Sequence, residues 1–411
     1  MPAIAYQYPP EIAALREAIT GFIRAEVIPR HEKHRALFED PHKAYDESGL
    51  RSAAHRALID EVRAASAEAG FFNLAVPEDL GGAGMGMTAY FAAWERIFHE
   101  CGFRYTLAHH MISHWAKGPS PLLRRMTPEL RAEVMPGLLA GRTSMCFALS
   151  EPGAGSDAAA IKTRAVRDGA GWRITGTKIW TTNSPYADYV CVFAVTDPER
   201  AAARKGGISC FLVPTDAPGF KVERLVYMFG HSHTDEALLS FEDVYVEPRQ
   251  LIGDLDRGFE AAMLGVALGR VYNIARAVGT ARWALELSVE YAKVRETFGR
   301  PLAERQGVMF PLAEAAMQVH AAHLMALNVV QLLDAGHRAH KELSMAKAYC
   351  CKVGLAVVDR AIQTHGAMGL TNEMGLADAL VAMRKINIAD GTAEIMHHVV
   401  AKELLAGNTD L

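Results

Sequence analysis

The sequence predicts an α+β fold in which a β-rich segment separates two helical regions. Apolar residues recur at helical spacing before about residue 143 and again after about residue 252. Between these regions, short β-type runs alternate with clusters of Gly, Asp and Pro. Because 411 residues are many for one hydrophobic core, we expect three domains, at residues 1–143, 144–252 and 253–411.

Composition and charge restrict the classes of partner. The net charge is −4 and no basic run is present, which argues against a nucleic-acid partner. No apolar stretch is expected to span a membrane, and the N-terminus lacks the features of a targeting peptide. Six cysteines without C-x-x-C spacing indicate reduced, buried thiols. We therefore expect a cytoplasmic protein.

The first helical region begins at Pro10, a favourable first helical residue, and Pro29 is expected to end this helix. The polar residues 30–52 are interpreted as a surface segment, and residues 53–69 as the next helix. The apolar positions of the first helix, at helical spacing, are Ile12, Leu15, Ile19 and Phe22.

Two motifs in this region were considered as ligand sites. The run G-G-A-G-M-G from Gly81 lacks the spacing and preceding strand of a dinucleotide loop, so a turn is predicted. His109, His110 and His114 would share a face of a helix, but no carboxylate or cysteine lies at metal-ligand spacing. No metal site is predicted.

The middle segment contains four clear strand candidates, at residues 172–180, 189–195, 208–213 and 237–246. The polar run from Thr196 is expected to be an exposed hairpin connection. After it, apolar residues from Val308 to Leu333 alternate in steps of four and three, which indicates a helix of a bundle.

Three motifs carry possible chemistry, each with a structural alternative. The glycine-rich turn at residues 148–157 suits a phosphate or is simply a turn. On the strand at residues 176–183, Trp180 and Thr182 share one face, which suits a flat cofactor ring or a sandwich core. The run at residues 295–301 suits pyrophosphate and adenine, or is a helix end with an arginine on its dipole.

A fourth motif, residues 384–395, places Asp390 before Gly391 where a basic helix ends. A carboxylate on a short tether suits a general base, which must approach the proton that it removes. Asp-Gly is also a common turn dipeptide, so a surface turn is the alternative.

The order of these motifs, followed by Q-x-x-G-x-x-G and D-G-T, closely resembles the acyl-CoA dehydrogenase family over nearly the whole chain. The resemblance implies an N-terminal helical domain, a central β-sandwich or barrel and a C-terminal four-helix bundle. It also implies one FAD per subunit, a homodimer or homotetramer (a dimer of dimers), and an electron-transferring flavoprotein as acceptor in fatty acid β-oxidation.

The resemblance also implies roles for individual residues. Asp390 would be the catalytic base, and Ser156, Arg270 and Gly391 would contact the acyl-CoA substrate. The flavin ring and pyrophosphate would be contacted by Phe147, Ala148, Leu149, Ser150, Ser156, Trp180, Thr181, Thr182, Thr392 and Glu394. The adenine half would be held by Arg295, Phe298, Gln306, Gln363, Gly366 and Ala367, partly from a neighbouring subunit.

In the implied reaction, the base removes the α-proton of the thioester while the β-hydrogen leaves as hydride to flavin N5, giving a trans-2-enoyl-CoA. Most family members carry Glu at the position of Asp390, and the missing methylene withdraws the carboxylate by about 1.5 Å. Asp occurs in the dehydrogenase module of kinase-fused animal acyl-CoA dehydrogenases, which this chain resembles at A-D-G. Asp also occurs in nitroalkane oxidases, so a flavin oxidase is an alternative, and a non-catalytic flavin-bound binding protein is a further one.

Overall fold

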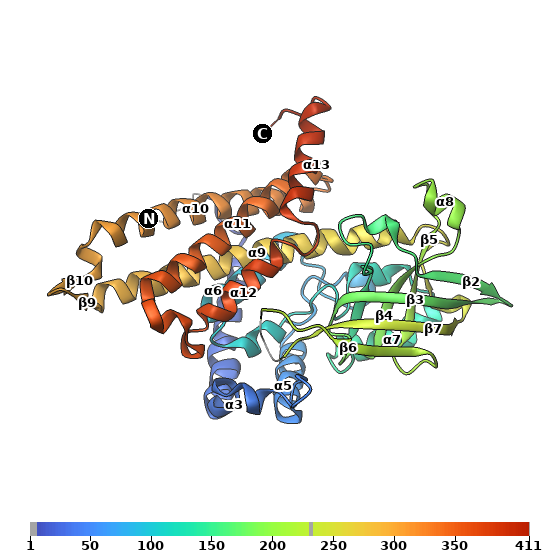
Figure 1. Cartoon of the computed structure of the whole chain (residues 1–411), viewed down its shortest axis with the longest axis horizontal. Coiled ribbons are helices and arrows are strands. Elements are labelled where there is room, and N and C mark those ends of the chain that lie inside the picture. Colours follow the sequence, from blue (N-terminus) through green and yellow to red (C-terminus); the bar gives the residue numbers. More distant parts are fainter. Residues whose placement is uncertain (1–5, 230–232, 411) are drawn as a thin grey trace. The chain divides into compact units, whose positions relative to one another are not determined.

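The computed structural model describes residues 6–229 and 233–410 (Figure 1). Contacts between residues divide the chain into two compact units. The helical unit comprises the described parts of residues 1–35, 85–109 and 269–411, and the β unit comprises those of residues 36–84 and 110–268.

The helical unit contains long helices from both ends of the chain. In Figure 1, α10 and α11 lie side by side, and α11 also packs against α12 and α13. Helix α9 begins within the β unit and enters the helical unit at Gly269. The α-helices are α1 (Pro10–Phe22), α2 (Ile28–Lys33), α6 (Gly86–Cys101), α9 (Gly258–Val294), α10 (Gln306–Asp334), α11 (His340–His365), α12 (Leu376–Ile386) and α13 (Ala393–Leu405).

Shorter elements connect these helices. They are the π-helix η1 (Ile23–Val27), the 3-10 helices η3 (Thr106–His110), η7 (Leu302–Glu304), η8 (Gly366–Leu370) and η9 (Asn372–Met374), and the hairpin of β9 (Glu296–Thr297) and β10 (Arg300–Pro301).

The prediction that Pro29 ends the first helix is wrong. The chain stays helical from Pro10 to Lys33, because the wider π-turn of η1 lies before the proline. Pro29 then occupies the first turn of α2, where a missing backbone N–H costs little.

The expectation that no apolar stretch could span a membrane also needs correction. Helix α10 is long and apolar enough to do so by length and composition. In the structure this helix packs against α6 and α11. Its hydropathy arises partly from apolar residues that remain exposed, among them Phe310, Met317 and Leu324.

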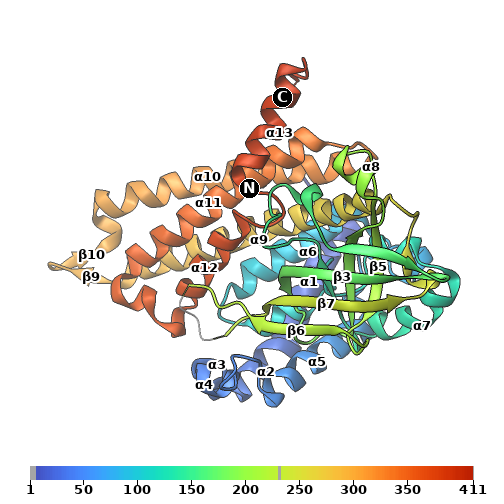
Figure 2. The same cartoon turned by 45° about the vertical axis from the view of Figure 1, so that its right-hand side comes forward.

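The β unit is organised around one eight-stranded sheet with the order β6-β7-β3-β2-β4-β5-β8, in which β1 pairs with β4. Figure 2 shows the long strands β3 and β7 running side by side. The strands are β1 (Met145–Ala148), β2 (Arg164–Asp168), β3 (Gly171–Thr182), β4 (Tyr189–Val195), β5 (Ile208–Pro214), β6 (Phe220–Leu225), β7 (Glu236–Val246) and β8 (Leu251–Ile252). The four predicted strands are thus confirmed.

Two hydrophobic clusters cover the two faces of β4 and β5, because successive side chains of a strand alternate in direction. One cluster joins Val192 and Phe211 to Ile174 and Leu239 of β3 and β7, so the sheet folds over on itself. The other joins Phe193 to residues of the helical segments between Pro121 and Leu139. The predicted combination of helical domains with a middle β domain is confirmed, whereas the exact domain boundaries stay a prediction.

Short helices make up the rest of the β unit: α3 (Arg35–Glu39, which starts at the unit boundary), α4 (Pro41–Ala44), α5 (Ala53–Glu68), α7 (Pro128–Leu139), α8 (Pro198–Ala202), η2 (Glu78–Leu80), η4 (Pro121–Arg125), η5 (Ala158–Ala160) and η6 (Pro248–Gln250). The predicted hairpin connection between β4 and β5 therefore includes the helix α8.

Contrary to the expectation, His109, His110 and His114 do not share a face of one helix. Helix η3 ends at His110, and His114 lies beyond it. His109 contacts the carbonyl of Gly102 through Nε2, at 2.8 Å. Within the described residues no group of three metal-ligating side chains was found.

A buried carboxylate joins three helices of the helical unit. Glu95 of α6 is fully buried and accepts hydrogen bonds from Arg16 of α1, at 2.6 Å, and from Arg282 of α9, at 2.5 Å. Burial favours the neutral acid, but the two guanidinium groups outweigh it and hold the pKa of Glu95 well below its usual range.

We expect Glu95→Gln to lower the free energy of unfolding by about 3 kcal/mol, because it leaves two largely buried guanidinium groups without their carboxylate. Urea denaturation measures this change. Glu286→Gln is the control, since the Glu286 side chain is largely exposed in its pair with His99 and should cost under about 1 kcal/mol. Equal effects of both substitutions would contradict this assignment.

Candidate active site

Asp390 lies in the short turn between α12 and α13, and its backbone conformation is unusual. Its φ is 56°, in the left-handed region, and the φ of Gly391 is 100°. Asp tolerates the left-handed region better than most residues, and glycine adopts it freely. A Cβ added to Gly391 would lie 2.7 Å from Cε of Met396. The left-handed φ therefore favours glycine after Asp390, whereas the flexible end of Met396 could move aside for a Cβ.

Three side chains from two helices hold this turn. From α9, Arg270 Nε donates to the carbonyl of Asp390 at 3.0 Å, and Asn273 Nδ2 donates to Oδ2 of Asp390 at 2.8 Å. From α11, the buried Lys347 donates through Nζ to the carbonyl of Gly391 at 2.6 Å. The carboxylate and the backbone of the turn are thus fixed independently.

The surroundings bring the pKa of the Asp390 carboxyl closer to neutral pH. Burial raises its pKa from the usual 3.8 to about 6, against the opposing effects of Lys347, Arg270 and the hydrogen bond from Asn273. A carboxylate that titrates near neutral pH is suited to accept a proton in one step and release it in another.

The turn also presents backbone donors. The N–H groups of Asp390 and Gly391 form no hydrogen bond with any residue that the structure describes. Two such donors beside a carboxylate can stabilise a carbonyl oxygen that gains negative charge while the carboxylate takes a neighbouring proton.

In the β unit, the predicted phosphate turn is anchored by a buried ion pair. Glu151 accepts a hydrogen bond from Lys178 Nζ of β3 at 2.8 Å, and from the backbone N–H groups of Lys162 and Thr163. Burial lowers the pKa of Lys178 to about 8, although Glu151 favours its charged form. The ion pair fixes the start of the turn, and Arg204 binds Asp157 at its end.

The predicted ring-contacting strand changes direction at Trp180. The pairing of β3 with β7 is irregular between Lys178 and Thr181, and Trp180 has a left-handed φ of 62°. Trp180 is 52% exposed, whereas Thr181 is 1% exposed. Thr182 is half-buried. An indole held outward in this way is available to cover a flat ring.

These residues fit a bound FAD. Trp180 offers an open aromatic face, and the buried hydroxyl of Thr181 has no partner among the described residues. The N–H groups of Gly153, Gly155 and Ser156 also make no hydrogen bond within the described chain. Unused donors in a glycine-rich turn suit a pyrophosphate. Of the other residues implied for this part, Ala148 and Leu149 are buried, Phe147 and Ser150 are half-buried, and Ser156 is exposed.

The residues implied for the adenine half lie in the helical unit and are all exposed: Arg295, Phe298, Gln306, Gln363, Gly366 and Ala367. Phe298 is 97% exposed at a left-handed φ of 49°. The rings of Tyr291 and His365 lie with their centroids 4.4 Å apart and join the ends of α9 and α11. This contact brings the implied residues that follow α9 toward those at the end of α11.

The two remaining implied residues follow the turn. Thr392 is the N-cap of α13, and its hydroxyl accepts the N–H of Ile395 at 3.3 Å. Glu394 is exposed in the first turn of that helix.

Sequence reasoning missed Asn273, Lys347 and Glu151. Asn273 follows Arg270 by three residues and therefore shares its helix face, which was a usable signal. Lys347 interrupts an apolar face of α11, but only the structure shows that its ammonium reaches Gly391.

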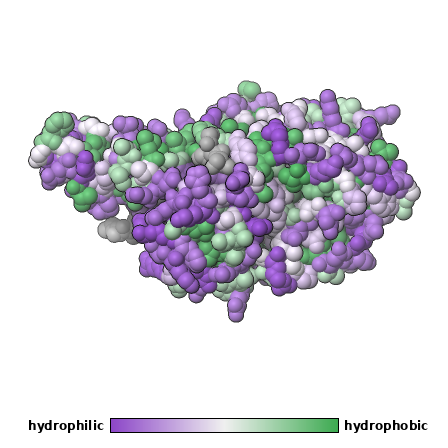
Figure 3. Space-filling model, turned by 60° about the horizontal axis from the view of Figure 1, so that its bottom comes forward, coloured by the Kyte–Doolittle hydropathy of each residue, from purple (hydrophilic) through white to green (hydrophobic). Residues whose placement is uncertain are grey.

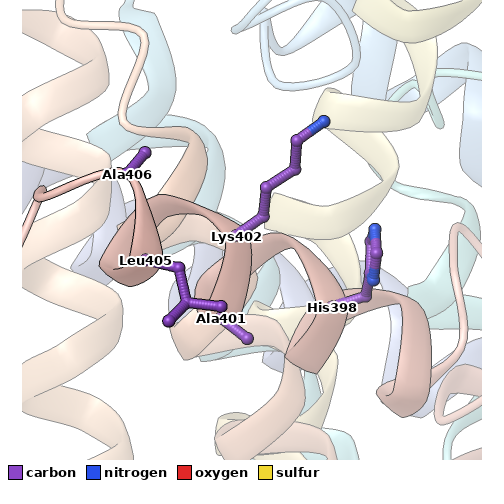
Figure 4. Close-up of a pocket in the computed structure, with 5 residues that line it drawn as sticks. All are labelled: His398, Ala401, Lys402, Leu405 and Ala406. Atoms are coloured by element: carbon purple, nitrogen blue, oxygen red, sulfur yellow. The ribbon is translucent and has the colours of Figure 1, made fainter.

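A surface pocket elsewhere is unrelated to this chemistry. It is lined by His398, Ala401, Lys402, Leu405 and Ala406, which all belong to α13 or directly follow it (Figure 4). None of these residues contacts Asp390 among the described interactions.

The raised pKa of Asp390 predicts that Asp390→Asn stabilises the fold in a pH-dependent way. Below the unfolded pKa of 3.8 both states are protonated and the substitution has little effect. As the pH rises to about 6, ionisation of the wild-type carboxyl favours the unfolded chain, so the gain from Asn grows to at most about 3 kcal/mol and then levels off. Thermal melts at about pH 4, 6 and 8 measure it. A gain that shrinks with rising pH would refute the raised pKa.

Comparison with known proteins agrees with this geometry. The N-terminal, middle and C-terminal domain families of acyl-CoA dehydrogenases match residues 9–142, 146–244 and 256–405. A probable acyl-CoA dehydrogenase of Bacillus subtilis is 32% identical over 394 residues, covering 95% of this chain and 97% of the relative. The bovine mitochondrial short-chain specific acyl-CoA dehydrogenase is 36% identical over 338 residues, covering 82% and 81%.

Solved structures give the same result. A putative acyl-CoA dehydrogenase from Mycobacterium abscessus superposes with a TM-score of 0.86 at 28% identity, covering 98% of this chain and 100% of that one. Butyryl-CoA dehydrogenase from Megasphaera elsdenii gives 0.82 at 26% identity, with the same coverages. The family acts on acyl-CoA and uses FAD. From its sequence and its fold, this chain belongs to the acyl-CoA dehydrogenase family.

Proposed function

We propose that this protein dehydrogenates an acyl-CoA thioester to its trans-2-enoyl product, with Asp390 as the base that removes the α-proton. The observation that carries the proposal is the Asp390 carboxyl, which has a pKa of about 6 and is held by Asn273. Similar proteins that are named for short-chain and butyryl substrates make short acyl chains a natural first choice of substrate.

The turn supplies two functions to this reaction. Removing a proton beside a thioester places negative charge on the carbonyl oxygen, which needs donors. The unused N–H groups of Asp390 and Gly391 are candidates for that role. Arg270 binds the carbonyl of Asp390, which shares a peptide plane with the N–H of Gly391, and so orients that donor. Lys347 holds the next peptide through the carbonyl of Gly391.

FAD, when bound, supplies the acceptor for the hydride that leaves the β-carbon. Trp180, Thr181 and Thr182 would contact its ring, and the turn that ends at Ser156 would hold its pyrophosphate. The adenine half would be held by Arg295, Phe298, Gln306, Gln363, Gly366 and Ala367. The exposure of these last residues supports contact with a molecule from outside the helical unit.

Asp in place of Glu leaves a second function to be tested. Nitroalkane oxidases use Asp to remove a proton from a nitroalkane, and the short side chain at Asp390 favours neither function. The A-D-G sequence at Ala389 supports the subgroup that resembles kinase-fused animal enzymes.

We expect short-chain acyl-CoA to bleach the oxidised flavin of the FAD-loaded protein under anaerobic conditions. Asp390→Asn should slow this bleaching by about 10³-fold or more, because no group remains to take the α-proton. Stopped-flow absorbance measures both rates, and Thr280→Val, at a buried position further along α9, is the control.

Two results would contradict the proposed function or the proposed role of Asp390. Reduction by a nitroalkane and by no thioester would make the protein an oxidase. Full activity of Asp390→Asn would exclude Asp390 as the base.

We also propose that the protein assembles as a homodimer or homotetramer and passes electrons to an electron-transferring flavoprotein in the cytoplasm. The exposed apolar residues Phe310, Met317 and Leu324 recur every seven residues on α10, at 62%, 61% and 42% exposure. Such a stripe suits a second copy. Figure 3 shows one face of the molecule, on which apolar groups in green interrupt the polar surface. One neighbour in fold is named as an electron transferring flavoprotein of Acidaminococcus fermentans, which supports this type of acceptor.

We expect Phe310→Glu with Met317→Glu to reduce the assembly to smaller species, because buried carboxylates would destabilise an apolar interface. Sedimentation velocity reports the mass. Val166→Glu, at an exposed apolar residue of β2, is the matched control and should leave the mass unchanged. An unchanged mass in the double variant would place the interface elsewhere.

A further inference from the structure

The two oxygens of the Asp390 carboxylate are not equivalent. Asn273, itself buried, donates to Oδ2 at 2.8 Å. No described residue donates a hydrogen bond to Oδ1. One oxygen is therefore held by the protein and the other is available to an outside proton, which is the asymmetry that a one-proton acceptor needs.

Lys347 is a second exceptional group beside the turn. It is fully buried, and the described residues include no ion pair to its ammonium. A buried charge without a paired carboxylate costs free energy, and within the described part of the chain the ammonium is satisfied by the Gly391 carbonyl. Burial lowers the pKa of Lys347, while the nearby Cys351 and Asp390 favour its charged form. From this position Lys347 binds the backbone of the turn and favours the ionised form of Asp390.

We propose that Asn273 and Lys347 are positioning residues that adapt this site to an aspartate base. Asn273 holds Oδ2 and leaves Oδ1 for the α-proton, and Lys347 fixes the Gly391 carbonyl and with it the direction of the turn. The inference rests on the proposed role of Asp390.

This arrangement compensates for the missing methylene of a glutamate. A shorter side chain has fewer torsions, so the backbone must place the carboxylate itself. The left-handed φ of Asp390 sets the direction of the side chain, and contacts from α9 and α11 hold the turn. A misplacement of about 1 Å at a reacting atom can cost about 100-fold in rate.

Electrostatics predicts the direction in which the pKa of Asp390 changes when either positioning residue is replaced. The ionisable groups around the turn are Arg270, Tyr272 and Arg276 on α9, Lys347 and Cys351 on α11, and Glu394 on α13. Both the ammonium of Lys347 and the hydrogen bond of Asn273 favour the ionised carboxylate. Removing either one therefore raises the pH at which Asp390 ionises.

The first test is a titration of Asp390 by infrared difference spectroscopy, in which the carboxyl band is assigned by its loss in Asp390→Asn. In Asn273→Leu and in Lys347→Met, we expect the midpoint to rise by about one pH unit, a tenfold change in acid dissociation. The controls are Thr280→Val on α9 and Lys341→Met on α11, two buried positions that do not contact Asp390. Neither control should move the midpoint.

The second test is the pH profile of kcat/KM for the FAD-loaded protein with a short-chain acyl-CoA. We expect the acid limb to shift upward as the infrared midpoint does. At about pH 6 both variants should lose roughly 10- to 100-fold, with partial recovery at about pH 8. A purely structural role would lower the rate at every pH without moving the limb.

Midpoints and acid limbs that stay within about 0.3 pH unit of the wild type would overturn the inference. Should Lys347→Met fail to fold in a thermal melt, Asn273→Leu and the charge-preserving Lys347→Arg decide the matter, the latter being expected to keep the wild-type midpoint. Full activity of Asp390→Asn would instead refute the proposed function, while the infrared result would still report on the two positioning residues.

Discussion

The candidate site depends on one backbone constraint, the left-handed turn of Asp390 and Gly391. A left-handed conformation costs a non-glycine residue about 1 kcal/mol or more, so surrounding contacts must hold it. The contacts come from Arg270, Asn273 and Lys347. These three residues lie on two long helices, so the packing of α9 with α11 sets the position of the carboxylate more than the turn's own sequence does.

Buried charged groups fix the chain at the places where regular structure stops. Glu95 joins α1, α6 and α9, and Glu151 with Lys178 ties the glycine-rich turn to β3. Lys347 does the same for the turn before α13. In each case hydrogen bonds to the buried group offset a costly desolvation, so the stabilisation is modest but the geometry is narrowly defined. Such narrowly defined geometry is needed at a site that must place a carboxylate accurately against a reacting atom.

The same surroundings set the chemistry. Burial would keep Asp390 protonated, and the neighbouring cations and the amide of Asn273 return its pKa only part of the way, to about 6. A base with that pKa is largely ionised at neutral pH and is therefore ready to accept a proton. The unused backbone donors of the turn lie beside it, where an enolate oxygen would need them.

The sequence by itself determined the class of fold, four of the strands between Trp172 and Val246, the long helix after Gln306 and the family, because each depends on local periodicity or on contiguous motifs. It also singled out Asp390. Only the tertiary structure decided what surrounds that residue, since Asn273 lies 117 positions from Asp390 and Lys347 lies 44 positions from Gly391, and both reach the turn through helix packing. The continuation of the first helix past Pro29 was likewise decided by a π-turn that local propensity does not reveal. Periodicity records which face of an element is buried, whereas the pairing of buried faces depends on contacts between distant residues.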